Sequence, residues 1–243
     1  FILRSGEGGV GKTSIAAHYF SGYQNSYAHV AWVLSEKSIA RAVSDLSYAL
    51  KIQFEPQDED QKRFKRTIEE IAKLEGNCLL VIDNANEAQD LEDSFLSLCH
   101  CENLRILVTS RVKRFDLDGS RKFAIEGLSE DDTLLLLETQ YHPLTSTEKH
   151  LLQQIRTAVS ANTLVLELMA KSLKEFNMLE DYGLERLLKE LQSKGILKLL
   201  PHAEEVKTYY QAKNSKFNKA TPEAIISAMY ELTELTEEEV ASL

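Results

Sequence analysis

The 243-residue sequence has no long apolar run and no excess of basic charge. No apolar stretch approaches the ~20 residues that a membrane-spanning helix needs, and no basic leader with a small-residue cleavage site opens the chain. Lysine plus arginine number 28 against 38 aspartate plus glutamate, giving a net charge of −10. Surfaces that coat nucleic acid are usually basic. We therefore expect no membrane partner, and a nucleic-acid partner is not expected for this segment.

Cysteine is also scarce, with three residues in the chain. Cys78 lies in an apolar run and is expected to be a small core residue. Cys99 and Cys101 flank His100, but no further ligands lie nearby at the spacing that a zinc site needs. We interpret this triplet as structural, and the cysteine usage as typical of a reducing cytoplasm.

The remaining composition is that of a folded globular protein, with 43% apolar and 27% charged residues. In the first half, strand-like runs alternate with helical patterns whose apolar residues recur every three or four positions. The expected strands are 1–4, 27–35, 77–83, 103–110 and 122–127, and the expected helices are 37–52, 61–75 and 86–99. This alternation predicts an α/β fold over residues 1–128, with a mainly parallel sheet that binds ligands beyond the carboxyl ends of its strands.

After about residue 128 the strand patterns stop. Ser129 with Asp132 predicts a helix start of the capping-box type before a leucine-rich helix, and Pro143 interrupts the pattern. Further helical runs follow at 146–159, 163–176 and 182–193. Four helices joined by short loops predict a small all-α bundle over residues 129–200.

The two ends of the chain suggest a segment of a longer protein. The sequence opens inside an apolar run at residues 1–3, and Thr236 with Glu239 forms a capping box for a helix that begins close to the last residue. Segment 201–220 is polar and lysine-rich, which favours a solvated connector over the alternative of a nucleic-acid patch. Thr221, followed by proline, then begins another helix.

Residues 6–13, GEGGVGKT, match the pattern G-x-x-x-x-G-K-[ST] between a strand and a helix. The glycines let the backbone turn its N–H groups toward phosphate oxygens, and the helix N-terminus adds partial positive charge. Lys12 can reach the β and γ phosphates, and Thr13 can offer its hydroxyl to Mg²⁺. A glycine-rich turn without a ligand is the alternative. The expected nucleotide-binding residues of this loop are Gly6, Gly8, Gly9, Val10, Gly11, Lys12, Thr13 and Ser14.

A second polar group follows the apolar run LLVID. Asp83 ends this expected strand, where its carboxylate can meet the same Mg²⁺ as Thr13. Many nucleotide hydrolases place a second acid next, but this chain has Asn84, whose amide can position water but cannot take a proton. Glu87 either serves as the base or is a solvated acid in the first turn of the next helix.

Arg111 follows the fourth expected strand at the same edge of the sheet. Its guanidinium could read the γ phosphate through bidentate contacts, and an ordinary surface arginine is the alternative. The basic run at 62–66 flanks the core-facing Phe64, so we interpret its charges as a solvated helix face. The candidate catalytic residues are Lys12, Asp83, Asn84 and Arg111, and the candidate metal ligands are Thr13 and Asp83.

The segments GEGGVGKTS, LLVIDN and ILVTSR, in this order and spacing, resemble the nucleotide-binding domain of STAND ATPases, in particular the NB-ARC subgroup, over about residues 1–200. The resemblance implies a P-loop NTPase sheet in the order 5-1-4-3-2, flanked by helices. It also implies ADP bound at rest, exchange for ATP, then opening and homo-oligomerisation of the full-length protein. It implies that Arg111 reads the γ phosphate and that 201–243 is a connector with the start of a winged-helix domain.

Two positions depart from that family's pattern. The family often carries G-L-P-L in its helical domain, and residues 162–166 here read NTLVL, without the proline. Many members also have a second acid where this chain has Asn84. The proline contact to nucleotide is therefore not expected here, and the water-activating position is weakened.

The sequence thus predicts an ADP/ATP-binding signal-transduction switch with weak ATPase activity that regulates an effector elsewhere in a longer chain. The alternatives are a fast motor-type or remodelling ATPase, which needs a base such as Glu87, and a catalytically dead scaffold, against which the intact Gly-Lys-Thr series argues. Phosphate contacts do not read the base, so the chemistry leaves guanine open. No N-K-x-D motif is visible, and the resemblance implies adenine.

Overall fold

The computed structural model describes residues 2–6, 8–112, 121–179, 182–194, 211–212 and 215–216. These residues divide into two compact units. The first contains the described residues up to Ile125 except Gly8–Val10, and the second contains Gly8–Val10 and the described residues from Glu126 onward. Within the described ranges, no helix is both long and apolar enough to cross a membrane.

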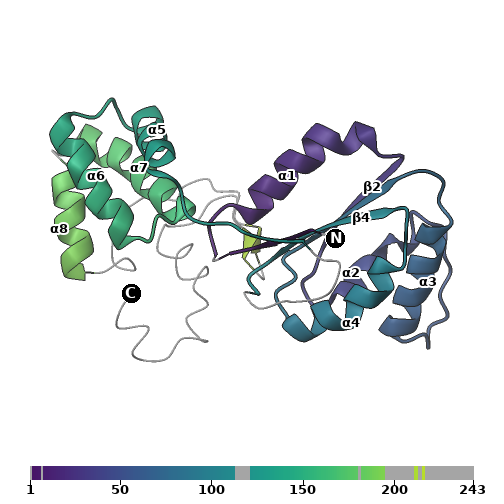
Figure 1. The fold of residues 1–243 in the computed structure, drawn as a ribbon. Helices are drawn as coiled ribbons and strands as arrows, with labels where there is room; N and C mark the ends of the chain where they lie inside the picture. The colour runs from purple at the N-terminus through teal and green to yellow at the C-terminus, as the bar shows by residue number, and fades with distance from the viewer. Residues whose placement is uncertain are drawn as a thin grey trace. The chain divides into compact units, whose positions relative to one another are not determined.

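The first unit is built on a five-stranded sheet (Figure 1). Its strands are β1 (Ile2–Ser5), β2 (His29–Leu34), β3 (Cys78–Asp83), β4 (Leu104–Ser110) and β5 (Arg121–Ala124). The order is β2-β3-β4-β1-β5, and each neighbouring pair is parallel. Read from the other edge, this is the predicted order 5-1-4-3-2, so the predicted fold class is confirmed.

Helices cover both faces of this sheet, with α1 on one face and the other three helices on the opposite one (Figure 1). The helices are α1 (Lys12–Tyr23), α2 (Ile39–Ser44), α3 (Asp60–Ala72) and α4 (Ala88–Cys99), with 3₁₀ turns η1 (Gln24–Ser26) and η2 (Asp45–Ser47). All six residues of β3 are buried. A strand covered on both faces needs a continuous apolar run rather than alternation, and this explains the sequence CLLVI before Asp83.

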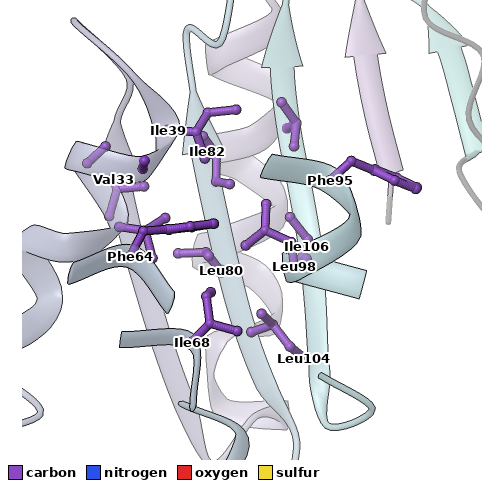
Figure 2. Packing of buried hydrophobic residues seen from close by; sticks show 14 of the residues in the cluster. Val33, Ile39, Phe64, Ile68, Leu80, Ile82, Phe95, Leu98, Leu104 and Ile106 are labelled. Atoms are coloured by element: carbon purple, nitrogen blue, oxygen red, sulfur yellow. The ribbon is translucent and has the colours of Figure 1, made fainter. Parts of the chain in front are cut away.

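The larger core of the first unit lies between the sheet and α2, α3 and α4 (Figure 2). Ile39 of α2 and Phe64 of α3 are each only 1% exposed, and Phe95 of α4 is 2% exposed. Burying one such side chain contributes roughly 1.5–3 kcal/mol. The apolar faces predicted for the three helices are the faces that pack here, and Cys78 belongs to the same core as predicted.

The predicted helix at 37–52 is wrong in its length. The structure has α2 only to Ser44, then η2, and Lys51 has a left-handed φ of 56°. Leu46 and Leu50 nevertheless pack partly buried against the core. A 3₁₀ turn keeps side chains near the same side as the preceding helix, so apolar spacing alone does not distinguish one long helix from a short helix with turns.

Lys62 and Arg66, in the basic run of α3, are exposed as predicted, and both also bind a buried acid. The side chain of Asp58 is 1% exposed, and its oxygens lie 2.6 Å from Nζ of Lys62 and 3.7 Å from a guanidinium nitrogen of Arg66. Arg63 donates to the carbonyl oxygen of Glu55 at 3.3 Å. The bond from Lys62, followed by the bond from the Glu55 amide, lowers the pKa of Asp58. This face therefore anchors the preceding loop.

In the described residues of the second unit, four helices surround one apolar core. They are α5 (Glu130–Gln140), α6 (Ser146–Ala158), α7 (Thr163–Leu179) and α8 (Leu184–Lys194). The Ser129 hydroxyl accepts from the amide of Asp132 at 3.1 Å, as its position predicts. Thr145 and Glu148 form a reciprocal capping box at the start of α6. Core residues include Leu137, Ile155, Leu166, Leu173 and Leu187.

The last part of the chain is described only at four residues. Two-residue strands β6 (Gln211–Ala212) and β7 (Ser215–Lys216) pair antiparallel. The rest of the expected connector and the helix expected from Thr221 lie outside the described residues. The expected start of a winged-helix domain therefore stays a prediction.

Candidate functional site

The parallel sheet brings the chemically interesting residues of the first unit to one edge. In the strand register, Ser5 at the end of β1 pairs with Ser110 at the end of β4. Ile82 of β3 pairs with Val108 of β4, which places Asp83 at the level of Thr109. The loop after β1 and the polar ends of β3 and β4 therefore meet where parallel sheets bind ligands.

The loop between β1 and α1 has the backbone that a phosphate-binding turn requires. Gly9 has φ 76° and Gly11 has φ 97°, both in the left-handed region that favours glycine. A Cβ on Gly11 would meet no heavy atom within 4 Å, so backbone strain rather than a clash opposes other residues there. No side chain caps the start of α1, and its first turn contains no acid. Its N–H groups and partial positive charge are therefore suited to an anion.

Lys12 lies at the start of α1 and bridges back across this turn. Its Nζ donates to the carbonyl oxygen of Gly6 at 2.8 Å, and the side chain is half-buried. The ammonium is thus held beside the loop whose N–H groups would face phosphate. Ser14 is exposed in the first turn of α1, and Val10 is buried, with 8% exposure.

Asp83 and Thr13 are brought together as the sequence predicts. The hydroxyl of Thr13 donates to Oδ1 of Asp83 at 2.9 Å, and Asp83 is 5% exposed. The Thr109 hydroxyl also donates to Oδ1 of Asp83 and accepts from the amide of Asn84 at 2.9 Å. Two hydroxyl donors from different elements therefore fix this carboxylate.

This oxygen pair fits Mg²⁺. The ion prefers oxygen ligands, and it is commonly held by one or two protein groups together with phosphate oxygens and water. Within the part of the chain that the structure describes, no group of three or more histidine, cysteine, aspartate or glutamate residues could hold a metal alone. Thr13 and Asp83 are therefore suited to an ion that they share with a bound phosphate.

Asn84 lies directly after Asp83 in a left-handed conformation, with φ 64°. Asparagine and aspartate both tolerate this conformation better than most residues, so the backbone favours a short polar side chain here. Oδ1 of Asn84 accepts from Nδ2 of Asn86 at 2.6 Å, and Oδ1 of Asn86 accepts from the backbone amide of Arg111 at 2.8 Å. The structure thus connects two of the predicted site residues through a third that the sequence analysis did not select.

Glu87, the other candidate base, is exposed and occupies the N-cap position of α4 without a side-chain cap bond. Its exposed location at the start of that helix agrees with the predicted solvated acid. Arg111 follows β4 and is half-buried, at the sheet edge where it was expected.

In the second unit, the stretch that lacks the expected proline bonds to the phosphate-loop backbone. Asn162 is 2% exposed, and its Nδ2 donates to the carbonyl oxygen of Gly8 at 2.8 Å. The backbone amide of Leu164 donates to the carbonyl oxygen of Gly9 at 3.0 Å, and the Thr163 hydroxyl donates to the carbonyl oxygen of Val10 at 3.4 Å. Peptide groups are planar, so fixing these carbonyls also orients the N–H groups of the residues that follow them.

We predict that Asn162→Ala lowers nucleotide affinity about tenfold, because the half-buried carbonyl oxygen of Gly8 loses its donor and the peptide group that it orients is no longer held. Asn162→Asp is the matched variant, since it keeps an acceptor for the Val165 amide, which Asn162 Oδ1 contacts at 3.3 Å. It removes the donor to Gly8 and should weaken binding as well. Equilibrium titration with ADP measures both, and unchanged affinity in both folded variants would contradict this role.

Sequence reasoning missed three residues that organise this site: Thr109, Asn86 and Asn162. Thr109 had a usable signal, because a hydroxyl at the end of the strand beside β3 can reach Asp83 once the strand order is known. Asn162 contacts a loop that is 154 positions away in the chain. No local spacing encodes that contact.

Comparisons with known proteins agree with this architecture. The family model described as the NB-ARC domain matches residues 1–147. Among solved structures, Cdc6p from Pyrobaculum aerophilum has a TM-score of 0.53 at 12% identity and covers 73% of this chain and 56% of its own. A Signal Transduction ATPase with Numerous Domains that carries a tetratricopeptide repeat sensor, from Pyrococcus horikoshii, has a TM-score of 0.52 at 17% identity. That match covers 99% of this chain and 41% of the other protein.

At these identities the two structures show a shared fold, and this chain spans about half the length of each of them. No curated protein matches the chain. The family match covers more than half of the 243 residues, and it includes the phosphate loop, Asp83 and Arg111. The chain belongs to the NB-ARC domain family.

Proposed function

We propose that this chain is a nucleotide-dependent signalling switch that holds ADP or ATP with Mg²⁺, hydrolyses ATP slowly and regulates an effector in a longer protein. The observation that supports it is a complete set of phosphate and metal groups combined with an amide, Asn84, at the water-activating position. Membership of the NB-ARC family supports adenine nucleotide as the ligand. We propose that the protein acts in the cytoplasm. We do not propose a nucleic-acid partner for this segment.

Binding would be carried by the loop, Lys12 and the Thr13–Asp83 pair. The loop amides and the α1 N-terminus would hold the phosphates, and Lys12 would exchange its bond to Gly6 for a phosphate oxygen. Bound Mg²⁺ would neutralise phosphate charge, with Thr13 and Asp83 holding it. Because Asp83 is already fixed by two hydroxyls, little side-chain order would be lost on binding.

Slow hydrolysis follows from the chemistry of Asn84. A neutral amide does not accept a proton at neutral pH, and its oxygen already accepts from Asn86 at 2.6 Å. What Asn84 keeps for a ligand is the Nδ2 donor, which can orient water or contact phosphate. This supports a protein that stays in its ATP state for long periods, with Arg111 as the proposed reader of the γ phosphate and homo-oligomerisation as the proposed output of the full-length protein.

Replacing Asn84 with aspartate tests whether the amide limits hydrolysis. Asn84→Asp keeps an acceptor for Asn86 and supplies a base, so we expect ATP turnover to rise about 10- to 100-fold with little change in ADP affinity. Steady-state phosphate release measures turnover. Asn25→Asp makes the same chemical change at an exposed position and should leave turnover unchanged. No increase in Asn84→Asp would show that the slow step lies elsewhere.

A fast motor-type ATPase would need Glu87 as its base, and its exposed position at the start of α4 does not favour that role. Glu87→Gln separates the two proposals. If wild-type turnover is slow and Glu87→Gln leaves it unchanged, the switch is supported. Fast wild-type turnover that is lost in Glu87→Gln, but kept in the equally exposed control Glu92→Gln, would overturn it in favour of the motor.

A further inference from the structure

Asn86 occupies the junction between the ends of β3 and β4. Its Nδ2 donates to Oδ1 of Asn84 at 2.6 Å, and its Oδ1 accepts from the backbone amide of Arg111 at 2.8 Å. Asn86 itself is half-buried. The side-chain amide of Asn86 therefore joins Asn84, which follows β3, to Arg111, which follows β4.

The other bonds at this junction hold backbone positions. The amide of Ala85 donates to the carbonyl oxygen of Thr109 at 2.9 Å, and the Ser110 hydroxyl donates to the carbonyl oxygen of Ala85 at 2.5 Å. These contacts fix the two strand ends next to each other. Asn86 adds a connection of a different kind, because it links the Asn84 side chain, which would act on the ligand, to the segment that carries Arg111.

We propose that Asn86 is a positioning residue that couples the Asn84 amide to Arg111 and thereby sets how strongly the chain prefers ATP to ADP. This inference rests on the proposed nucleotide switch. An asparagine suits the role because its amide both donates and accepts, so it satisfies both partners at once. Hydrogen bonds in such chains act together, so loss of the central member removes one bond from each of its two neighbours.

The coupling should be specific for the γ phosphate. The phosphates that ADP and ATP share would be held by the loop and Lys12, and the bonds of Asn86 go instead to Asn84 and Arg111. Asn84 and Arg111 are the two groups at this edge proposed to act on the γ phosphate or its attacking water. Loss of these two bonds should therefore weaken ATP binding while leaving ADP binding almost unchanged.

The test is the dissociation constant of ADP divided by that of ATP. A non-hydrolysable analogue replaces ATP, so that hydrolysis does not affect the measurement. In Asn86→Ala we expect affinity for the ATP analogue to fall about 5- to 20-fold and ADP affinity to change less than about twofold. Asn86→Ser is the second variant if alanine impairs folding. Its hydroxyl keeps a polar partner at the site but is too short to span both neighbours, so the ratio should fall there as well.

Asn103→Ala is the matched control, because Asn103 is also a half-buried asparagine whose amide joins two elements. Its Nδ2 donates to the carbonyl oxygens of Ile71 at 3.3 Å and Leu74 at 2.9 Å. Asn103 directly precedes β4, so it lies at the end of that strand opposite to Arg111. This variant should lose stability but keep the wild-type ratio. Asn86→Ala made in an Arg111→Ala background should change the ratio less than about twofold, since coupled residues are not additive.

A merely structural Asn86 would weaken both nucleotides equally, as would a general loss of folding, and that result would overturn the inference. An unchanged ratio in folded Asn86→Ala, with wild type binding both nucleotides, would overturn it while leaving the proposed switch intact. Wild type that binds neither nucleotide would overturn the proposed function and this inference with it. A selective fall in affinity for the ATP analogue that disappears without Arg111 supports it.

Discussion

Lys12→Ala is expected to lower the affinity for both ADP and ATP about 100-fold. The ammonium is positioned by its 2.8 Å bond to Gly6, at the mouth of a loop whose amides have no acidic neighbour in the first turn of α1. Removing one charged partner from a phosphate site costs about 3 kcal/mol, which corresponds to about two powers of ten in a dissociation constant. The affinity for both nucleotides should fall, because both carry the β phosphate. Fluorescence or calorimetric titration at fixed Mg²⁺ measures the change.

The control for this substitution is Lys65→Ala, which removes the same charge from an exposed position on α3 in the same unit. It should change affinity by less than about twofold, because exposed charges beyond the Debye length of ~8 Å are screened. Folded Lys12→Ala with wild-type affinity would mean that the glycine-rich turn binds no phosphate. In that case the alternative of a turn without a ligand would be correct.

Gly127→Ala is expected to destabilise the second unit by about 2–3 kcal/mol through overpacking. A Cβ on Gly127 would lie 2.7 Å from the carbonyl carbon of Ala161 and even closer to its oxygen. These are backbone atoms, and Ala161 itself has a left-handed φ of 54°. The same carbonyl accepts from the Leu128 amide at 2.9 Å, and the Leu128 oxygen accepts from Arg156 at 2.8 Å. A shift that relieved the clash would break these bonds.

Urea denaturation followed by far-ultraviolet circular dichroism measures this loss of stability. The matched control is Gly22→Ala, where the added Cβ meets no heavy atom within 4 Å and lies inside α1. Alanine is favoured over glycine in a helix by about 1 kcal/mol, so the control should be neutral or slightly stabilised. If Gly127→Ala had the same urea midpoint of unfolding as wild type, residues 127 and 161 would not pack as described.

The parts of the fold that could be predicted are those with strong local patterns. The apolar run before Asp83 is a central strand because both of its faces are covered, and the apolar spacing around Phe64 marks the buried side of α3. Parallel topology then follows from the alternation of strands and helices. The strand order came instead from the family resemblance, because sequence alternation does not state which strands are neighbours.

What could not be predicted depends on contacts between distant segments. The sequence places Thr13 and Asp83 70 positions apart, and only the folded sheet brings their oxygens to 2.9 Å. The sequence predicts Asn84 to be a catalytic weakness, and the structure adds that its backbone, with φ 64°, favours a short polar side chain. The absent proline near residue 162 removes an expected contact to nucleotide, and that stays a prediction. Asn162, in the same stretch, donates to the carbonyl oxygen of Gly8, a contact that no local pattern reveals.

Calorimetric titration of the chain with ADP and with ATP, in the presence of Mg²⁺ and again after chelation, tests the central claim most directly. We predict saturable heat for both nucleotides, weakened by chelation because Thr13 and Asp83 are proposed to share Mg²⁺ with a phosphate. Steady turnover of ATP should remain slow in the same samples. The absence of heat with either nucleotide would contradict the account and support a scaffold that has lost nucleotide binding.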